Sequence, residues 1–187
     1  MMTDAELIRK CKNGNQKYQE MLYQRFAPQL MGIALRYARN QEDAEDIVHD
    51  TFVKVLTNLD KFDENGSLDG WIKKITVNTA INAYYKKKKT ENTIEINDVE
   101  EQIATVSIAP NDFLSEKILL QFINELPDGY RTIFNMFEID GYSHKEISDL
   151  TGSSYSTVRS QLFKAKRALK KRIEQHLGKE LNDKIRN

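Results

Sequence analysis

Apolar side chains between residues 44 and 59, with one threonine among them, recur at spacings of three and four positions. This series constrains the fold more than any other feature of the chain, because it puts them on one face of an α-helix. The helix would begin after Asn40, a residue type that caps helix N-termini. The series consists of Ala44, Ile47, Val48, Thr51, Phe52, Val55, Leu56 and Leu59. Similar periods recur elsewhere and no stretch shows strong β-strand alternation, so the sequence predicts an all-α protein.

Local signals set the ends of the first two predicted helices. Thr3 and Glu6 have the spacing of a capping box, which opens a short helix that Gly14 ends. A second periodic stretch covers residues 15–40, and Pro28 inside it lacks the amide hydrogen that a continuous helix needs. We therefore expect the second helix to be kinked or divided at Pro28.

An acidic segment separates two groups of predicted helices. Residues 91–116 contain seven acidic and no basic residues, and the part up to Pro110 has no sustained helical period. Such a composition is typical of a linker with little fixed structure, which we place at 91–112. The sequence thus predicts two small helical domains, 1–90 and 113–187, joined by an acidic flexible linker. Further helices are expected at 71–89 before the linker and at about 112–125, 128–140, 143–151 and 154–176 after it.

Composition indicates a cytoplasmic protein. The chain has 187 residues, of which 40% are hydrophobic, and this is enough for a core in each domain. The one cysteine, Cys11, has no partner for an internal disulfide, which suits a reducing compartment. The N-terminal segment is polar and charged, unlike a signal peptide, and no apolar run approaches the ~18 residues of a membrane span. We expect a cytoplasmic location without membrane insertion.

Residues 142–171 have the pattern of a helix-turn-helix. Ser143 and Glu146 form a second capping box. Gly152 suits the left-handed turn that ends a helix, and Ser154 can cap the helix that follows. The residues predicted to face inward are Ile147, Leu150, Val158, Leu162, Ala165 and Leu169.

The outward face of the second of these helices carries side chains suited to DNA. An arginine and short hydroxyl residues near its N-terminus suit base edges in a major groove, and lysines farther along suit phosphates. A plain helical hairpin with a basic, solvated face is the alternative. The outward residues are Tyr155, Ser156, Arg159, Ser160, Phe163, Lys164 and Arg167. Two basic clusters strengthen the nucleic-acid interpretation, one at Lys86–Lys89 and one formed by Lys164, Lys166, Arg167, Lys170, Lys171 and Arg172.

Three motifs resemble one protein family. GYSHKEISDLTGSSYSTVRSQLFKAKRAL (141–169) resembles the C-terminal DNA-binding region of bacterial extracytoplasmic-function (ECF) sigma factors of the sigma-70 family. DAEDIVHDTFVKV (43–55) resembles the family's polymerase-binding helix, and FDENGSLDGWIKKITVNTAINAYYKKKK (62–89) resembles its promoter-melting segment. The resemblance implies a sigma factor that binds core RNA polymerase and directs promoter-specific transcription initiation. It implies sigma region 2 at 1–90 and sigma region 4 at 113–187.

The resemblance also implies partners and excludes a catalytic role. It implies core RNA polymerase, promoter DNA and an anti-sigma factor as partners, and no catalytic residue, metal site or cofactor. Ser153 and Gln161 depart from the residues usual in the family, so the promoter sequence is not predicted.

By this resemblance, the acidic face of the helix that follows Asn40 docks on the clamp helices of the largest polymerase subunit. Complementary charge would aid encounter and orientation. The alternative is that these carboxylates solvate a helix whose first turn favours negative charge. The residues concerned are Asp43, Glu45, Asp46, His49 and Asp50.

The resemblance further implies that the N-terminal domain melts the −10 promoter element while the helix-turn-helix binds the −35 element. Melting requires a pocket for an unstacked base, an amide that reads the base edge and cations along the backbone. Asn78 supplies the amide by resemblance. The pocket is assigned to a loop of Ser67, Leu68 and Asp69, and the cations to Lys73, Lys74, Lys86 and Lys87.

The sequence leaves the roles of three aromatic residues of this segment ambiguous. Trp71 begins the apolar stripe of its helix, so we expect it in the core rather than as a platform for stacking bases. Tyr84 and Tyr85 are adjacent in the sequence. We expect at least one of them to be buried.

Two other functional classes compete with a sigma factor. The dipeptide His49-Asp50 could belong to a metal phosphohydrolase, but His144 and His176 both lie in the C-terminal half. A glycine-rich phosphate loop and a zinc-ligand cluster are absent from the sequence. A repressor or activator would explain the helix-turn-helix but not the promoter-melting resemblance. Binding to core polymerase discriminates the classes, because only a sigma factor requires it.

Overall fold

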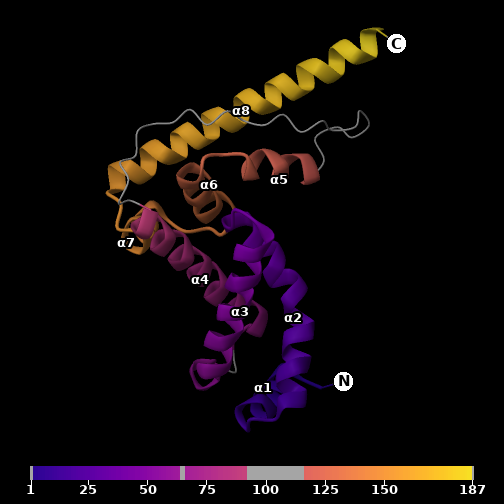
Figure 1. Cartoon of the computed structure of the whole chain (residues 1–187), viewed down its shortest axis with the longest axis vertical. Coiled ribbons are helices and arrows are strands. Elements are labelled where there is room, and N and C mark those ends of the chain that lie inside the picture. The colour runs from indigo at the N-terminus through magenta and orange to yellow at the C-terminus, as the bar shows by residue number, and fades with distance from the viewer. Residues whose placement is uncertain (1, 64–65, 92–115, 187) are drawn as a thin grey trace. The chain divides into compact units, whose positions relative to one another are not determined.

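The computed structural model describes residues 2–63, 66–91 and 116–186, and every regular element within them is helical (Figure 1). The elements form two compact units, Met1–Glu91 and Asn92–Asn187, which confirms the predicted fold class. Beyond Glu91, the predicted linker lies outside the described residues. The first unit contains α1 (Asp4–Lys12), α2 (Gln16–Tyr37), α3 (Gln41–Thr57), η1 (Leu59–Lys61) and α4 (Leu68–Glu91). The second contains α5 (Glu116–Asn124), α6 (Asp128–Phe134), η2 (Asn135–Ile139), α7 (His144–Thr151) and α8 (Tyr155–Arg186).

The first unit is built around three helices. Helices α2, α3 and α4 each pack against the other two, and α1 packs on α2 and η1. Burial raises the pKa of the Cys11 thiol, which stays neutral within this core. Each fully buried aliphatic side chain contributes about 1.5–3 kcal/mol to folding. The largest fully buried side chains are Leu7, Ile8, Leu22, Leu30, Val48, Val55, Leu68, Ile72 and Ile81.

The predicted caps of the first unit are present. The backbone N–H of Glu6 donates to Thr3 Oγ1 at 3.2 Å, and the N–H of Thr3 donates to Glu6 Oε2 at 3.0 Å. Asn40 Oδ1 accepts a hydrogen bond from the N–H of Asp43 at 2.8 Å, so α3 begins where the sequence predicts. Capping signals are local in sequence, which is why they transfer to the structure.

Of the two alternatives predicted for α2, a kink or a division at Pro28, the structure excludes the division, and the predicted start of α4 is wrong. Helix α2 is not divided at Pro28 and runs without a break from Gln16 to Tyr37. Pro28 is exposed, so the carbonyl group that loses its helical partner can be hydrated. Helix α4 begins at Leu68, three residues before its predicted start at Trp71.

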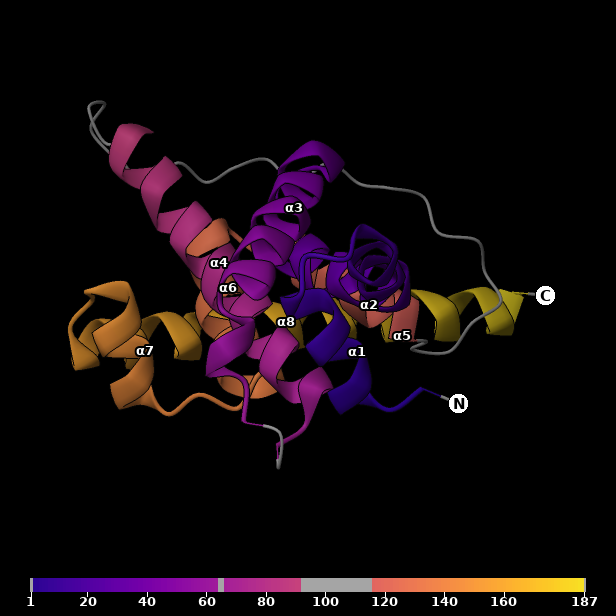
Figure 2. The ribbon, with the colours of Figure 1, turned by 90° about the horizontal axis from the view of Figure 1, so that it is seen from below.

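The second unit carries the predicted helix-turn-helix, formed by α7 and α8. Ser143 and Glu146 make their capping box, and Gly152 ends α7 with φ +67° in the left-handed region. Helix α7 lies beside the first turns of α8 (Figure 2). Ile147 is fully buried, but Leu150 is 42% exposed, so its predicted inward position is wrong. The cause is that this short helix buries only the edge that carries Ile147 against α8 and η2.

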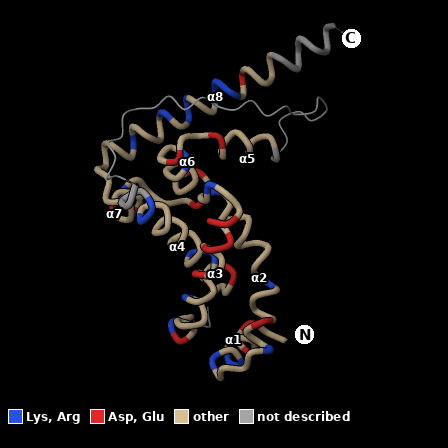
Figure 3. The backbone as a smooth tube through the Cα atoms, in the orientation of Figure 1, with Lys and Arg blue, Asp and Glu red and all other residues tan. Residues whose placement is uncertain are grey.

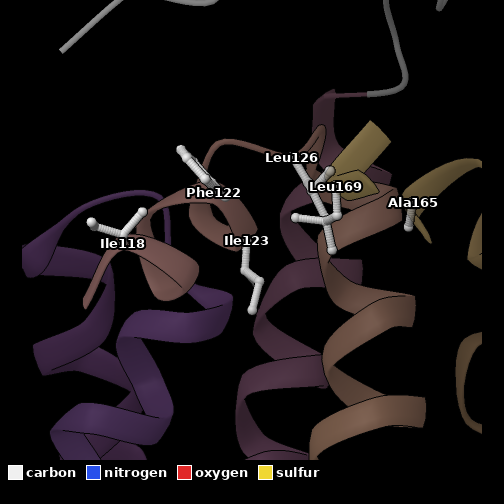
Figure 4. Packing of buried hydrophobic residues seen from close by; sticks show 6 residues of the cluster. All are labelled: Ile118, Phe122, Ile123, Leu126, Ala165 and Leu169. Atoms are coloured by element: carbon white, nitrogen blue, oxygen red, sulfur yellow. The ribbon is translucent and has the colours of Figure 1, made fainter. Parts of the chain in front are cut away.

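A hydrophobic cluster joins α5 to the middle of α8 (Figure 4). It contains Ile118, Phe122, Ile123, Leu126, Ala165 and Leu169. All four residues predicted for the buried stripe of α8, Val158, Leu162, Ala165 and Leu169, are buried. Helix α8 continues to Arg186, beyond its predicted end at residue 176. Of the helices that the structure describes, none combines the length and the hydropathy that crossing a bilayer requires.

Candidate nucleic-acid interface

Five of the seven predicted DNA-binding residues of α8 lie together on its outward face. All seven are exposed, and Tyr155 and Phe163 expose 52% and 67% of their surface. Lysine and arginine recur along this helix (Figure 3). A helix repeats every 3.6 residues, so Ser156, Arg159, Ser160, Phe163 and Arg167 share one side of α8 opposite its buried stripe. The face can therefore enter a groove as one surface.

The turn that starts α8 is fixed by serine and threonine hydroxyls. Ser148 Oγ donates to the carbonyl oxygen of Ser153 at 2.6 Å, which ties α7 to the turn. The N–H of Thr157 donates to Ser154 Oγ at 3.1 Å, which confirms Ser154 as the cap. These contacts hold the first turn of α8 in place, as a helix that reads base edges with its N-terminal residues requires.

Ring contacts link Tyr155, at the start of α8, to η2 and α7. The His144 ring lies between Tyr155 and Phe137, with centroid distances of 5.6 Å and 4.4 Å. Lys166 Nζ lies 5.5 Å from the centroid of the Phe137 ring. The exposed tyrosine is thus in contact with His144, which in turn contacts Phe137.

Two cations of the predicted basic cluster are paired with carboxylates of their own unit. Lys166 Nζ lies 2.6 Å from Glu138 Oε1 in η2. Arg172 pairs with Glu125 at the end of α5, and both side chains are mostly buried. Sequence alone could not show this, because the acidic partners lie 28 and 47 positions away in the chain. These pairs secure α8 to the rest of the unit.

In the first unit, Asn78 lines a hollow of about 340 Å³ between α3, η1 and α4. Trp71 also lines it, and its ring packs on Phe62 at a centroid distance of 5.4 Å. Trp71 is half-buried, so it has both a core contact and a surface toward the hollow. The polar and aromatic lining residues are Lys54, Asn58, Lys61, Trp71, Asn78, Thr79 and Asn82. Amides, a ring and ammonium groups are the groups that a single nucleic-acid strand uses.

Of the three residues assigned to a base-holding loop, Ser67 precedes α4 as predicted, whereas Leu68 and Asp69 belong to the helix. Ser67 Oγ accepts a hydrogen bond from the N–H of Gly70 at 3.1 Å and caps α4. Leu68 is the first residue of α4 and is only 1% exposed, so its placement in a loop is wrong. Asp69 Oδ2 lies 2.7 Å from Lys73 Nζ. Leu68 packs in the hydrophobic core, and α4 therefore begins three residues before its predicted start.

The predicted cations of α4 are divided between two sides of the helix. Lys73 pairs with Asp69 and lies about 140° around the helix from Asn78, so the two side chains do not share a face. Lys74 and Lys86 are exposed and lie closer to the side of Asn78. Lys87 turns toward α3, where it pairs with Asp43.

The acidic face of α3 is also divided. Asp43, Asp46 and Asp50 line a second hollow of about 640 Å³, whose other wall includes Lys86 and Lys87 of α4. The remaining two predicted residues, Glu45 and His49, are exposed but do not line this hollow. We refer to Asp43, Asp46 and Asp50 as the acidic row.

The prediction that at least one of the two tyrosines of α4 is buried is not met. Tyr84 and Tyr85 are both half-buried, so neither is fully enclosed in the core. Their rings meet edge to face at a centroid distance of 4.9 Å. Tyr84 also lines the larger hollow.

Several residues of the hollows were not singled out from the sequence. Lys54 and Asn82 line both hollows, and Lys54 Nζ donates to Thr79 Oγ1 at 3.1 Å. Asn82 follows Asn78 by four positions, a spacing that already places both on one helix face. The contribution of α3 and η1 to the smaller hollow, by contrast, depends on how these elements pack on α4. No local sequence signal shows that packing.

The His49-Asp50 dipeptide is on the surface of α3. His49 Nδ1 lies 3.9 Å from Asp50 Oδ1, and both side chains are largely exposed. Within residues 2–63, 66–91 and 116–186, no three histidine, cysteine, aspartate or glutamate residues are grouped so that they could hold a metal ion. The His49-Asp50 dipeptide is therefore part of the exposed surface of α3.

Models of two regions of one protein family match the chain, one in each unit. Sigma-70 region 2 matches residues 22–90, which include α3, α4 and both hollows. Sigma-70 region 4 matches residues 116–169, which include the helix-turn-helix. The order of the two matches is that of the two units.

Curated relatives cover nearly the whole chain. The ECF RNA polymerase sigma-E factor of Haemophilus influenzae is 27% identical over 183 residues, covering 92% of this chain and 96% of the relative. The ECF RNA polymerase sigma-E factor of Escherichia coli K12 is also 27% identical over 183 residues, covering 92% and 95%.

Similar solved structures include CnrH in complex with the cytosolic domain of CnrY, with a TM-score of 0.47, 21% identity and coverage of 90% of this chain and 96% of that one. The sigma factor RpoE of Bartonella quintana, in complex with the anti-sigma factor NepR, has a TM-score of 0.49, 19% identity and coverage of 81% and 94%. The two family matches and the full-length relatives agree with the motifs of α3, α4 and α8. The chain belongs to the ECF group of the sigma-70 family, and it is a sigma factor that directs transcription initiation from promoters.

Proposed function

We propose that the two units divide promoter recognition between duplex binding and strand opening. The observation that carries the proposal is the placement of two different surfaces on separate units. The second unit has a basic, exposed helix face on α8, and the first has an amide-lined hollow at Asn78. A helix face suits the major groove of a duplex, whereas a hollow with amides and a ring suits an unstacked base.

In the second unit, the outward face of α8 binds the −35 element. Arg159 and Ser160 lie near its N-terminal end, where side chains of a recognition helix reach base edges. Lys164 and Arg167 follow along the helix and contact phosphates, which hold the register without reading sequence. Phe163 supplies an apolar contact within this polar face.

In the first unit, the smaller hollow holds a base of the melted −10 element. Asn78 reads the base edge, and Trp71 forms part of the wall. Lys54, Lys61, Lys74 and Lys86 supply positive charge to the strand backbone. This set replaces the loop of Ser67, Leu68 and Asp69 as the base-holding group.

Helix α3 binds core RNA polymerase through its exposed acidic face. Acidic residues mark this helix in Figure 3, and Glu45, Asp46, His49 and Asp50 are all exposed. Val53 adds an exposed apolar side chain to α3. The partner is a basic surface of the clamp helices, and charge complementarity sets the orientation of docking.

Membership of the ECF group supports three further parts of the proposal. An anti-sigma factor restrains the protein until it is needed. The protein works in the cytoplasm, where core polymerase is found. It assists the polymerase without catalysing a reaction of its own.

Transcription with purified components tests the proposal. Core polymerase is mixed with a panel of promoters, with and without the protein, and the start sites of the transcripts are mapped. We expect new, promoter-specific transcripts only when the protein is present. Duplex binding by the protein without any binding to core polymerase would instead support a repressor or activator.

A further inference from the structure

The smaller hollow of the first unit contains a cation that a hydrogen bond holds in place. Lys54 lines this hollow from α3, and its Nζ donates to Thr79 Oγ1 of α4 at 3.1 Å. Thr79 Oγ1 in turn donates to the backbone carbonyl oxygen of Ile75 at 2.8 Å, so α4 fixes the hydroxyl group as well. Within the residues that the structure describes, Lys54 makes no ion pair. An ammonium group has three N–H donors, so two donors of Lys54 remain for a ligand.

The polar lining of the smaller hollow consists of ammonium, hydroxyl and amide groups. No aspartate or glutamate is among the described residues that line it, whereas the acidic row forms part of the wall of the larger hollow. Asn58 lies at the end of α3, and its Nδ2 donates to the backbone carbonyl oxygen of Lys54 at 2.8 Å. This hydrogen bond orients the amide and leaves Asn58 Oδ1 as an acceptor. The smaller hollow therefore combines a fixed cationic donor with amides.

The four DNA bases differ in how well they match an ammonium group. An amide both donates and accepts hydrogen bonds, so it can match any base, whereas an ammonium group only donates. Guanine, thymine and cytosine each carry a ring carbonyl oxygen that accepts from such a donor. Adenine has no carbonyl oxygen, and its amino group N6 lies beside the ring-nitrogen acceptor N7. Lysine accordingly pairs with guanine O6 and N7, whereas asparagine pairs with adenine N6 and N7.

We propose that Lys54 selects the base that enters the smaller hollow by donating to a ring carbonyl oxygen, so that guanine, thymine and cytosine are accepted and adenine is rejected. The inference rests on the proposed function, because it assumes that the hollow receives a base of the melted strand. It adds the class of base that the hollow takes. It also makes Lys54 a specificity-determining residue, beyond its share of the positive charge along the strand backbone.

Lys74 is the matched comparison for Lys54. It is exposed on α4, close to the side of Asn78, and it is not among the residues that line either hollow. A lysine in that place suits a phosphate, and a phosphate contact carries no sequence information. Lys54→Met and Lys74→Met both remove an ammonium group and keep a long unbranched side chain. The same change at the two positions therefore separates base selection from backbone contact.

The test uses the full-length protein assembled with core polymerase and a fluorescein-labelled single strand from the −10 region of a promoter that this complex transcribes. Anisotropy titrations measure affinity while each nucleotide in turn carries each of the four bases. The position held by the hollow is the one at which Asn78→Ala removes the base preference. At that position, hypoxanthine and unsubstituted purine are also compared, because they differ by the carbonyl group and the hydrogen on its neighbouring nitrogen. Melting curves of each variant report folding.

We expect the parent complex to bind each carbonyl-bearing base, hypoxanthine included, about 5- to 100-fold more tightly than adenine or purine, as a charged hydrogen bond to a base edge allows. Lys54→Met should bind all of these strands about equally. Lys54→Arg keeps the charge and the donors and should retain the preference. Lys74→Met should keep the full preference, weaken binding of every strand alike and lower the salt slope by about 0.7.

Adenine bound as tightly as the other bases at that position would overturn the selection. The parent complex alone gives this result, so an unstable variant does not remove the test. A preference that survives in Lys54→Met, or a loss that is uniform across bases as in Lys74→Met with a normal melting curve, would remove Lys54 from base selection. If no position loses its base preference in Asn78→Ala, the hollow does not hold a base, and the proposed function fails together with the selection.

Discussion

Phe163 has the largest exposed fraction, 67%, of the exposed large hydrophobic side chains that the structure describes. It lies among Arg159, Ser160 and Arg167 on α8, where solvent exposure of an aromatic ring brings no stability. In a major groove, the one apolar group on a base edge is the thymine methyl, and phenylalanine is among the side chains that contact it. The residue scale thus offers a test in which a single methyl group is changed.

Replacing thymine by uracil in the −35 duplex should weaken binding at the position that Phe163 contacts. Burial of one methyl group is worth about 0.8 kcal/mol, which corresponds to about a fourfold change in affinity. Duplexes selected from random sequence, with each thymine replaced in turn, give the measurement. Phe163→Ala should bind the thymine and uracil duplexes equally. If it still distinguishes them, another side chain makes the contact.

Arg159 and Lys164 should differ in what they contribute to duplex binding. Arg159→Ala should cost about 1–3 kcal/mol on the preferred sequence if the guanidinium binds a guanine through two hydrogen bonds. Lys164→Ala should weaken binding to all sequences alike and reduce the salt slope by about 0.9, since it contacts a phosphate. Titrations on preferred and scrambled duplexes at several salt concentrations distinguish the two. Equal losses on both duplexes for Arg159→Ala would remove it from sequence reading.

At the scale of elements, the sequence predicts what is local and misses what depends on packing. The capping boxes of α1 and α7 were predictable because both partners lie within four residues. The start of α4 was not, because Leu68 joins the core of the unit and Ser67 caps the helix there. Asn78 was identified from its motif, whereas Lys54 and Lys61 reach its hollow only through the packing of α3 and η1 on α4. The prediction for Leu150 was wrong for the opposite reason. Its sequence spacing is that of a buried position, but its side chain is 42% exposed.

The acidic face of α3 should be required for polymerase binding and not for folding. Asp46→Lys combined with Asp50→Lys places positive charge where a basic partner docks, so binding to core polymerase should be lost. Both side chains are exposed, and surface substitutions usually change stability by less than about 0.5 kcal/mol. Pull-down with core polymerase and a melting curve measure the two effects. Glu20→Lys, on the exposed surface of α2, is the control and should retain binding. Unchanged binding of the double variant would contradict the assignment of this face.

On the scale of the whole molecule, each unit has a core of its own. Leu22, Leu30 and Ile72 are among the core residues of the first unit, and Phe122 and Leu169 belong to that of the second. Domains with separate cores fold independently. Residues 1–90 and 113–187, expressed separately, should each unfold in one cooperative transition on heating. Two fragments without cooperative transitions would contradict this division.

The central claim is that one unit places the protein on duplex DNA and the other opens it. Asn78→Ala tests it most directly, because an amide that reads an extruded base contributes only after the strands separate. With core polymerase, this variant should bind the −35 duplex like the parent protein yet form fewer open complexes. A promoter with a pre-melted bubble should restore opening only in part.

Permanganate reactivity of unpaired thymines, measured beside duplex-binding titrations of the same complexes, is the decisive measurement. The account predicts low permanganate reactivity and normal duplex binding for Asn78→Ala. For Arg159→Ala it predicts that duplex binding is the step that is weakened. Parental levels of opening by Asn78→Ala, or a loss of duplex binding as severe as that of Arg159→Ala, would contradict the division of labour between the two units.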